Sequence, residues 1–375
     1  MRLARLALAT TRQMRFITRL KFQPFWLELR LGFLGKTTML CAFFSHIFSV
    51  ALLYKVSKQI LKRKFDRVVS AVVFILLPAT MASAILVNDA GIIIALSLLS
   101  IYLYQLRKML AFYALLCVLP FVSGAFLVYF SAIFIFAVYR RDAKMAWVAA
   151  LLFALCFYFY GFDSGGKPRG HLLDTVSIFA AAFSPFVFVY FVYAMYRIWI
   201  KETKNLLWFV CITAFLFCLF LSIRQRLELE NYLPFCVISV PILVRVFFSS
   251  YRVRLPMFRR GYKILASFVA TSLLAGFLFV LFNEMLYGAL KDPTRHFVYR
   301  YHVAKELAKE LKNKGIENIV VEDNKLALRL KFYGIDTWTH ANLRLENLDQ
   351  RNNYGNIAVY KFGVKIANFK IIKDG

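Results

Sequence analysis

The strongest constraint on this chain is an alternation of about ten apolar stretches with short polar connections between Thr37 and Tyr287. A helix that crosses the roughly 30 Å hydrocarbon core of a bilayer needs about 20 apolar residues, and fewer where it is short or broken inside the protein. Because the chain is also 61% hydrophobic, too little polar surface remains for a soluble globule. We therefore predict an all-α polytopic membrane protein. The expected spans cover 37–55, 68–87, 90–106, 108–122, 124–139, 145–160, 175–197, 205–223, 231–249 and 264–287.

The loops between these stretches are alternately rich and poor in Lys and Arg. Twenty Lys and Arg occupy one set of loops, and four occupy the other set. By the positive-inside rule, the rich loops are cytoplasmic and the poor loops are extracytoplasmic. Ten spans then place both ends of the chain outside. Loop charge also explains the net charge of +28 better than a nucleic-acid surface does, so we expect no nucleic-acid partner.

Three regions follow from this pattern. Residues 1–36 are expected to form an amphipathic juxtamembrane segment, residues 37–287 the transmembrane helical domain, and residues 288–375 a small extracytoplasmic α/β domain. All six cysteines lie in apolar stretches without CxxC spacing, so they are interpreted as small core residues rather than as disulfide or zinc ligands.

The last region changes character. Its pattern predicts a helix from Pro293 to Lys314 that ends at Gly315, and then a β-rich run from Ile316 to Val321. A second short helix is expected around 326–333, and a strand pair near 357–362 and 369–372. This region carries no Gly-rich phosphate loop and no His/Cys metal spacing, so we expect a capping or docking role for it.

Three polar clusters lie on the predicted outer face, where an ionisable group costs a few kcal/mol unless something pairs with it. In the first cluster, Ile85 to Gly91, Asp89 lies between two apolar spans. Its carboxylate is a candidate general base, or a ligand for a hydroxyl or a cation. The alternative is that Asn88 or Asp89 caps the helix that follows, and the two roles are compatible.

The second cluster is the glycine-rich loop from Gly161 to Asp174, which carries Lys167, Arg169 and His171. Exposed backbone N–H groups and two nearby cations suit an anionic headgroup or a phosphate. A solvated connection with incidental charge remains the alternative, and His171 also fits an ordinary interfacial residue.

The third cluster runs from Ile223 to Phe235. Its charges lie at the mouth of a membrane helix, where the forked donors of arginine suit a phosphate. The alternative is mutual Arg/Glu pairing that caps the helix. Its candidate residues are Arg224, Arg226, Glu228, Glu230 and Tyr232.

With these pieces in order, the chain resembles the polyprenyl-phosphate-dependent glycosyltransferases of the GT-C class. This group includes protein mannosyltransferases and the aminoarabinose transferase of lipid A. The resemblance covers roughly residues 37–375 and depends on the order and sidedness of loose motifs. These are LPATMASAILVNDAG (77–91), GHLLDTVSIFAAAFSPFVFVYFVYAMYRI (170–198), RLELENYLPFCVISVPILV (226–244), and AKELAKELKNKGIENIVV (304–321) with LKFYG (330–334).

The resemblance implies a polyprenyl phosphate sugar as the donor substrate. Arg224 and Arg226, with Lys167 and Arg169, would stabilise the departing phosphate, whose charge grows as the glycosidic bond breaks. Asp89 would orient or deprotonate the acceptor, which gives inversion at the anomeric carbon. Contacts to the sugar or the acceptor would come from His171, Glu228, Glu230 and Tyr232. No metal site is indicated, and dependence on a divalent metal stays open, because one Asp offers too few ligands.

The chain departs from the family at its start. The principal acidic motif of the family, an Asp-Glu pair in the first outer loop after an initial transmembrane helix, has no counterpart here. Glu28 is the one acidic residue before Thr37, and the first 21 residues carry six Lys and Arg without an apolar stretch long enough to span. MRLARLALATTRQM resembles the amphipathic helix that follows the acidic pair. We therefore expect the printed chain to begin downstream of that pair, with Glu28 as a substitute acid in the alternative case.

The leading functional prediction is a glycosyltransferase of the bacterial inner membrane, with its active face and C-terminal domain in the periplasm. It would move a sugar from undecaprenyl phosphate to lipid A, a lipid-linked glycan or a protein. One alternative is a transporter or flippase of a lipid-linked sugar, although such proteins usually show inverted repeats and charges at the midplane. The other alternative is a non-catalytic remnant, which follows if the acidic pair is truly absent.

Overall fold

The computed structural model describes residues 35–85, 89–161, 170–224, 229–289, 292–296, 298–321, 323–337, 343–348, 357–361 and 363–373. Five of the candidate residues lie outside these ranges. They are Glu28, Lys167, Arg169, Arg226 and Glu228. Most of the described residues fall into two compact units, within Cys41–Leu278 and Phe279–Gly375.

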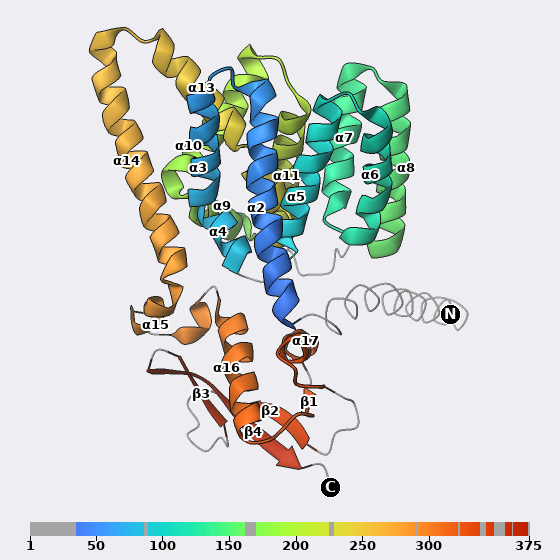
Figure 1. Cartoon of the computed structure of the whole chain (residues 1–375), viewed down its shortest axis with the longest axis vertical. Helices are drawn as coiled ribbons and strands as arrows, with labels where there is room; N and C mark the ends of the chain where they lie inside the picture. The colour runs from blue at the N-terminus through green and yellow to red at the C-terminus, as the bar shows by residue number, and fades with distance from the viewer. Residues whose placement is uncertain are drawn as a thin grey trace. The chain divides into compact units, whose positions relative to one another are not determined.

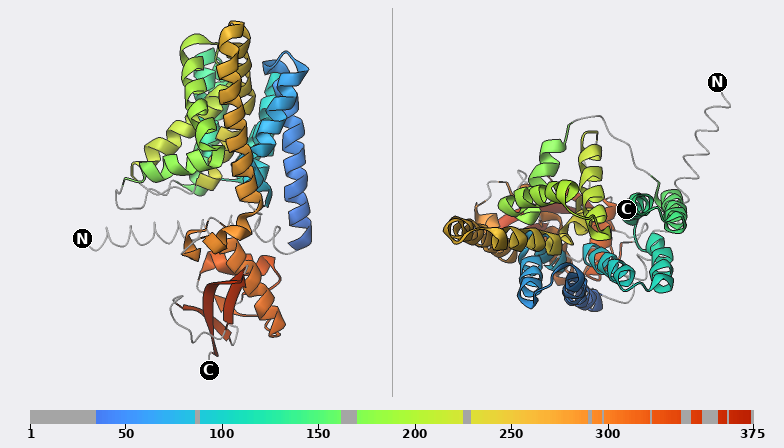
Figure 2. Two further views of the ribbon diagram at one scale, coloured as in Figure 1. Left: turned by 90° about the vertical axis from the view of Figure 1, so that its left-hand side faces the viewer. Right: turned by 90° about the horizontal axis from the view of Figure 1, so that it is seen from above.

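The first unit is a bundle of helices that run back and forth, joined by short connections (Figure 1). The blue to teal helices run roughly side by side in the views of Figure 2. The elements are α2 (Gly35–Ile60), α3 (Lys64–Leu76), α4 (Pro78–Ile85), α5 (Ala90–Gln105), α6 (Met109–Val122), α7 (Phe126–Arg140), α8 (Ala143–Tyr160), α9 (Leu172–Phe183), α10 (Pro185–Lys201), α11 (Leu206–Ser222), η1 (Leu229–Asn231), α12 (Leu233–Val237), α13 (Val240–Val253) and α14 (Pro256–Leu281).

Every one of the ten predicted spans coincides with helical structure, and the mostly helical class with a small C-terminal sheet is confirmed. Within the described chain, three helices are long and apolar enough to cross a membrane, α8, α12–α13 and α14, or up to five spans if each of two bent helix pairs counts as one. Four further apolar helices, α5, α6, α7 and α11, are shorter, between 10 and 17 residues. The number of ten spans therefore stays a prediction.

The continuous span predicted over 175–197 is divided in the structure. α9 and α10 meet at an angle of 104°. Ser184 lies between them with φ of 70°, and Pro185 opens α10. Proline lacks the N–H that would continue the helical hydrogen bonds, and its ring clashes with the preceding turn, so the chain bends here. A second bend, of 63°, separates α3 from α4 at Pro78.

Large apolar side chains cover much of the outside of this bundle. On α14, Ile264 is 72% exposed and Phe268 is 55% exposed, and on α6 Leu110 is 90% exposed. Contiguous apolar surface of this extent is unusual for a soluble protein, whereas it is the normal lining of a protein that faces lipid. The outer surface therefore supports a membrane protein independently of helix length.

The centre of the bundle is packed with aromatic rings. Phe126 and Tyr129 of α7 each lie 5.8 Å from the ring of Phe235 on α12. The hydroxyl of Tyr129 donates a hydrogen bond of 2.8 Å to Ser100 on α5. Buried aromatic pairs add about 0.5–1.5 kcal/mol each beyond their buried area, so the short helix α12 is firmly held against α7.

The second unit contains a four-stranded sheet in the order β1-β2-β4-β3. β1 pairs in parallel with β2, while β4 pairs antiparallel with both β2 and β3. The elements are η2 (Asn283–Met285), α15 (Leu286–Ala289), η3 (Pro293–Arg295), α16 (Tyr299–Asn313), β1 (Val320–Val321), α17 (Asn324–Phe332), β2 (Leu343–Leu348), β3 (Ile357–Lys361) and β4 (Val364–Lys373).

Most elements of this unit were predicted, with corrections at their ends. The helix expected from Pro293 is a short 3-10 turn followed by α16, and the β-rich run at 316–321 forms a strand only at its last two residues. The expected strand pair is a hairpin that turns at Gly363, where φ is 76°. β2 was missed, although Leu343 and Leu345 alternate with charged residues in the way typical of a half-buried strand.

One buried ion pair joins α3 to α13 at the end of the bundle that carries the basic loops. Arg252 donates to both oxygens of Asp66, at 2.5 and 2.6 Å. The side chain of Asp66 is 2% exposed, whereas that of Arg252 is 35% exposed. Removing one partner of such a pair leaves an uncompensated charge, which is costly in a site without water.

We expect Asp66→Asn to destabilise the bundle by about 2 kcal/mol, below the usual cost of breaking a fully buried pair because Arg252 keeps partial access to solvent. Thermal unfolding of the detergent-solubilised protein measures this change. Asp142→Asn is the matched control, because Asp142 caps α8 by accepting from Met145 N and asparagine caps equally well. Equal losses in the two variants would contradict a specific role for the pair.

Candidate functional site

Asp89 occupies the position expected from the sequence, at the start of α5. Its backbone carbonyl accepts from Ile93 N at 2.9 Å, which begins the helix. Its side chain makes no capping hydrogen bond to the first turn, and the residue is half-buried. Asp89 therefore precedes the first residue of the helix, as predicted, and Asn88, the other predicted capping residue, lies outside the described residues.

His171 links the second cluster to the third. It immediately precedes α9, and its backbone N–H donates a 3.0 Å hydrogen bond to the carbonyl of Ser222, the last residue of α11. Its Nδ1 lies 3.3 Å from Oδ2 of Asp174, one turn into α9. A segment far away in the sequence is thus brought next to the charged stretch that follows α11.

Three candidate residues of the third cluster are described, namely Arg224, Glu230 and Tyr232. Arg224 is exposed, and its backbone N–H donates to Leu221 O at 3.0 Å, which turns the chain away from α11. Glu230 is exposed in η1, and Tyr232 is half-buried with its ring 5.7 Å from Phe217. Ser222, whose carbonyl accepts from His171 N, precedes Arg224 by two residues in the chain. An exposed guanidinium at this end of the bundle suits an anionic group.

Helix packing brings the first cluster to the same end of the bundle. α4, which leads toward Asp89, packs against α9 and α12, and α12 also packs against α5 and α11. The described residues of the three predicted clusters therefore share one end of the bundle, while the loops rich in Lys and Arg lie at the other end (Figure 1). The backbone contact between His171 and Ser222 links His171 to the stretch that contains Arg224. Asp89 reaches the same end of the bundle because its helix, α5, packs against α12.

Sequence reasoning missed two residues at this end. Asp174 was noted only as the end of a loop, yet it is the carboxylate that contacts His171. His46 lies in α2, stacked on Phe74 at 6.1 Å, and no hydrogen-bond partner for its Nδ1 is found among the described residues. Its neighbour Ser45 has its Oγ 3.7 Å from the point where a side chain at Gly91 would begin. The sequence signal for His46 was an ionisable side chain inside an apolar helix.

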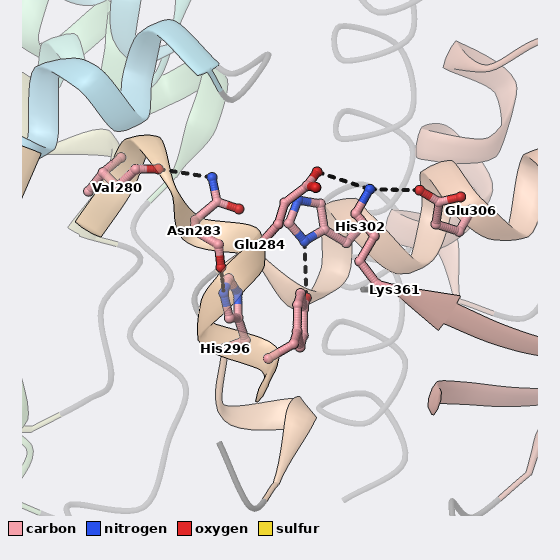
Figure 3. A network of polar contacts seen from close by, with 8 residues as sticks. Val280, Asn283, Glu284, His296, His302, Glu306 and Lys361 are labelled. Carbon is pink, nitrogen blue, oxygen red and sulfur yellow. Dashed lines mark hydrogen bonds and ion pairs between the residues drawn. The ribbon is translucent and has the colours of Figure 1, made fainter. Parts of the chain in front are cut away.

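The second unit holds a separate network of polar contacts around Lys361 (Figure 3). Lys361 Nζ, on β3, donates to Glu306 Oε1 at 2.8 Å and to Glu284 Oε1 at 3.0 Å. Burial lowers the pKa of Lys361, but its hydrogen bonds to the two glutamates raise it by more, so the net shift is upward. A lysine held charged in this way is a cross-link between the connection after α14, α16 and β3, and not a nucleophile.

Two histidines complete this network. His296 Nε2 donates to Asn283 O at 2.8 Å and its Nδ1 accepts from Val298 N at 3.1 Å, so the ring is neutral. His302 Nδ1 lies 3.1 Å from the hydroxyl of Tyr287, whose ring stacks on His296 at 4.2 Å. Burial and then the charge of Lys361 lower the pKa of His302 to about 4. Neutral rings and a paired lysine describe a structural network, and the capping or docking role of this region stays a prediction.

Across the ranges that the structure describes, no group of three or more His, Cys, Asp or Glu side chains is arranged to hold a metal ion. Comparisons of this chain with protein-family models, with curated proteins and with solved structures find no match. The function is therefore argued from the geometry of the bundle end.

The titration of His302 makes the second unit less stable in acid. An imidazole in the unfolded chain titrates near 6.5, whereas the folded unit holds the pKa of His302 near 4, so the unfolded chain binds more protons between these values. Stability is therefore full above about pH 6.5 and falls as the pH drops toward about 4. Hydrogen exchange of α16 peptides in the full-length protein, corrected for intrinsic rates, measures this loss between pH 7 and pH 5.

We expect His302→Gln to weaken this pH dependence. His171→Gln is the control, because it removes a histidine from the other unit and leaves the network intact. If the wild type and His302→Gln lose α16 protection to the same extent on acidification, His302 is not the titrating group.

Proposed function

We propose that this chain is a membrane glycosyltransferase that moves a sugar from a polyprenyl phosphate, such as undecaprenyl phosphate, to an acceptor at the outer face of the bacterial inner membrane. The observation that carries the proposal is the hydrogen bond from His171 N to Ser222 O, at 3.0 Å. It brings His171, at the start of α9, next to the end of α11, which Arg224 follows two residues later. A lipid phosphate needs both cations and an apolar surface, and the exposed Arg224 at the end of an apolar bundle supports this choice of donor.

The proposed step is a displacement at the anomeric carbon. The acceptor oxygen forms the new bond to that carbon while the bond to the polyprenyl phosphate oxygen breaks, and the released phosphate keeps the bonding electrons. Arg224, with Arg226, Lys167 and Arg169, would stabilise the growing phosphate charge. Asp89, at the start of α5, would accept the proton of the acceptor. His171, Glu228, Glu230 and Tyr232 would contact the sugar or the acceptor, and Glu28 would be a second acid.

Two features support the choice of Asp89 and Arg224 as the first residues to test. Asp89 is half-buried at a helix start, where the first turn of α5 favours a negative charge. Arg224 is exposed, so its forked donors are available to a phosphate without breaking the backbone contact that turns the chain.

A transporter or flippase of a lipid-linked sugar is the second candidate, and the bent helix pairs favour it. Discontinuous helices are a recurring feature of transporter folds, where the broken ends face the substrate. The bends of 63° and 104° are of this kind. Sugar transfer and lipid movement leave different products, so one experiment separates them.

The test uses the full chain in proteoliposomes with a panel of undecaprenyl phosphate sugars and a lipid A acceptor. Release of undecaprenyl phosphate is measured by mass spectrometry, because it is the product common to every sugar. We expect Arg224→Gln and Asp89→Asn each to lower release about 100-fold, the usual effect of removing one charge-stabilising group. Arg260→Gln, an exposed arginine at the other end of the bundle, should keep full activity.

Movement of the intact lipid-linked sugar across the bilayer, without release of undecaprenyl phosphate, would replace the proposal by the transporter. Absence of both activities in wild-type protein would favour the non-catalytic remnant. Full release by both site variants would show that the reaction occurs elsewhere in the molecule.

A further inference from the structure

A polar hollow lies at the end of the bundle opposite the candidate site, between the last turns of α10 and α13. Its volume is about 410 Å³. Three cations line it, together with two serine hydroxyls and two tyrosines. The polar lining residues include Arg197, Lys201, Arg254, Ser249, Ser250 and Tyr196. None of the predicted outer-face residues contributes to this hollow.

Two of the three cations lie on one side of α10, and the third lies at the end of α13. Arg197 and Lys201 are four residues apart on α10, so they lie on the same face and repel each other. Ser250 and Arg254 have the same spacing at the end of α13. Helix C-termini favour positive charge, but this effect does not require two like charges on one face. An anion between the helices would relieve the repulsion.

The nearby carboxylate is already engaged. Glu202 Oε2 lies 2.9 Å from Arg245, and its other oxygen lies 3.9 Å from Arg197. Among the described residues, no carboxylate lies within 4.0 Å of Lys201 or Arg254. The hollow therefore keeps an excess of positive charge after the internal ion pairs are formed.

Two of the arginines are held in position before any ligand arrives. The Arg254 guanidinium lies over the ring of Tyr262, 4.5 Å from its centre. Arg197 Nη1 donates to the hydroxyl of Ser250 across the hollow. Positioning donors in advance reduces the entropy that a ligand must lose on binding.

The rim of the hollow is apolar and open. Val253 is 87% exposed, Tyr196 is 64% exposed and Ile200 is 56% exposed. Exposed aliphatic and tyrosine side chains next to cations are typical of the boundary between lipid tails and headgroups. A ligand that fits both the charges and the rim carries an anionic head and apolar tails.

We propose that this hollow binds the headgroup of an anionic phospholipid from the leaflet on the basic side of the membrane. Basic hollows between helices on the cytoplasmic side are sites of this chemistry, where each cation near the membrane surface contributes about 1 kcal/mol. A free phosphate offers the same charge but no tails, so it would not use the apolar rim. The site is separate from the proposed sugar transfer and remains whether or not transfer occurs.

The test compares the wild-type chain with the double variant Lys201→Gln/Arg254→Gln. Both side chains are exposed, so the variant should fold, which its thermal unfolding without added lipid verifies. Native mass spectrometry of the detergent-solubilised protein measures retained phosphatidylglycerol and phosphatidylcholine. We expect the double variant to bind phosphatidylglycerol about 25-fold more weakly, about fivefold for each cation, with phosphatidylcholine unchanged.

The matched control is Arg141→Gln/Lys144→Gln, which removes the same charges from an exposed loop of the same set. It should bind phosphatidylglycerol within twofold of the wild type. An equal loss in the control would show that the lipid responds to diffuse basic surface and overturn the site. Complete displacement of the lipid by millimolar inorganic phosphate would identify a free-anion site and overturn the lipid assignment, whereas persistence of the lipid supports it.

Discussion

The bundle depends on one constraint, which is that backbone groups in an apolar environment must find partners inside the protein. The two helix breaks show how this is met. Pro78 has no N–H to give to Phe74 O, and the hydroxyl of Thr80 donates to that carbonyl instead. Thr80 Oγ1 also lies 2.8 Å from Leu77 O, and its side chain is fully buried. A single threonine therefore makes a bend of 63° tolerable inside the bundle.

At the second helix break, between α9 and α10, a polar side chain finds its partner on a distant helix. Ser184 accepts from Phe188 N at 2.9 Å, which starts α10, and its hydroxyl lies 2.8 Å from that of Ser272 on α14. The bends also arrange the candidate site. α4 lies between the first bend and Asp89 and packs on α9, whose start carries His171. Straight helices would carry these polar ends past one another, so the breaks and the gathering of polar residues are the same feature of the fold.

The sequence predicts where helices lie because apolar runs and basic loops are local signals, and every predicted span coincides with helix. Loop charge also predicts that the polar clusters lie opposite the basic loops, and the described residues of these clusters do lie at that end of the bundle, while the membrane side stays a prediction. The sequence does not predict the contacts that complete these clusters. Ser184 contacts Ser272, which is 88 residues later in the chain. His171, just before α9, contacts Ser222 at the end of α11. Such partners depend on packing, which periodicity does not encode.

The cationic side chains of this chain have different physical roles. Counting Lys and Arg in each loop does not distinguish these roles. Arg252 neutralises the buried Asp66, and Arg245 engages Glu202, so these cations stabilise the bundle from within. Lys201 has a different environment, since it lines an open hollow with an apolar rim. A positive-inside pattern would be satisfied by any placement of these charges in the loops. The clustering of cations at the facing ends of α10 and α13 is a separate property. These cations repel each other unless an anion lies between them.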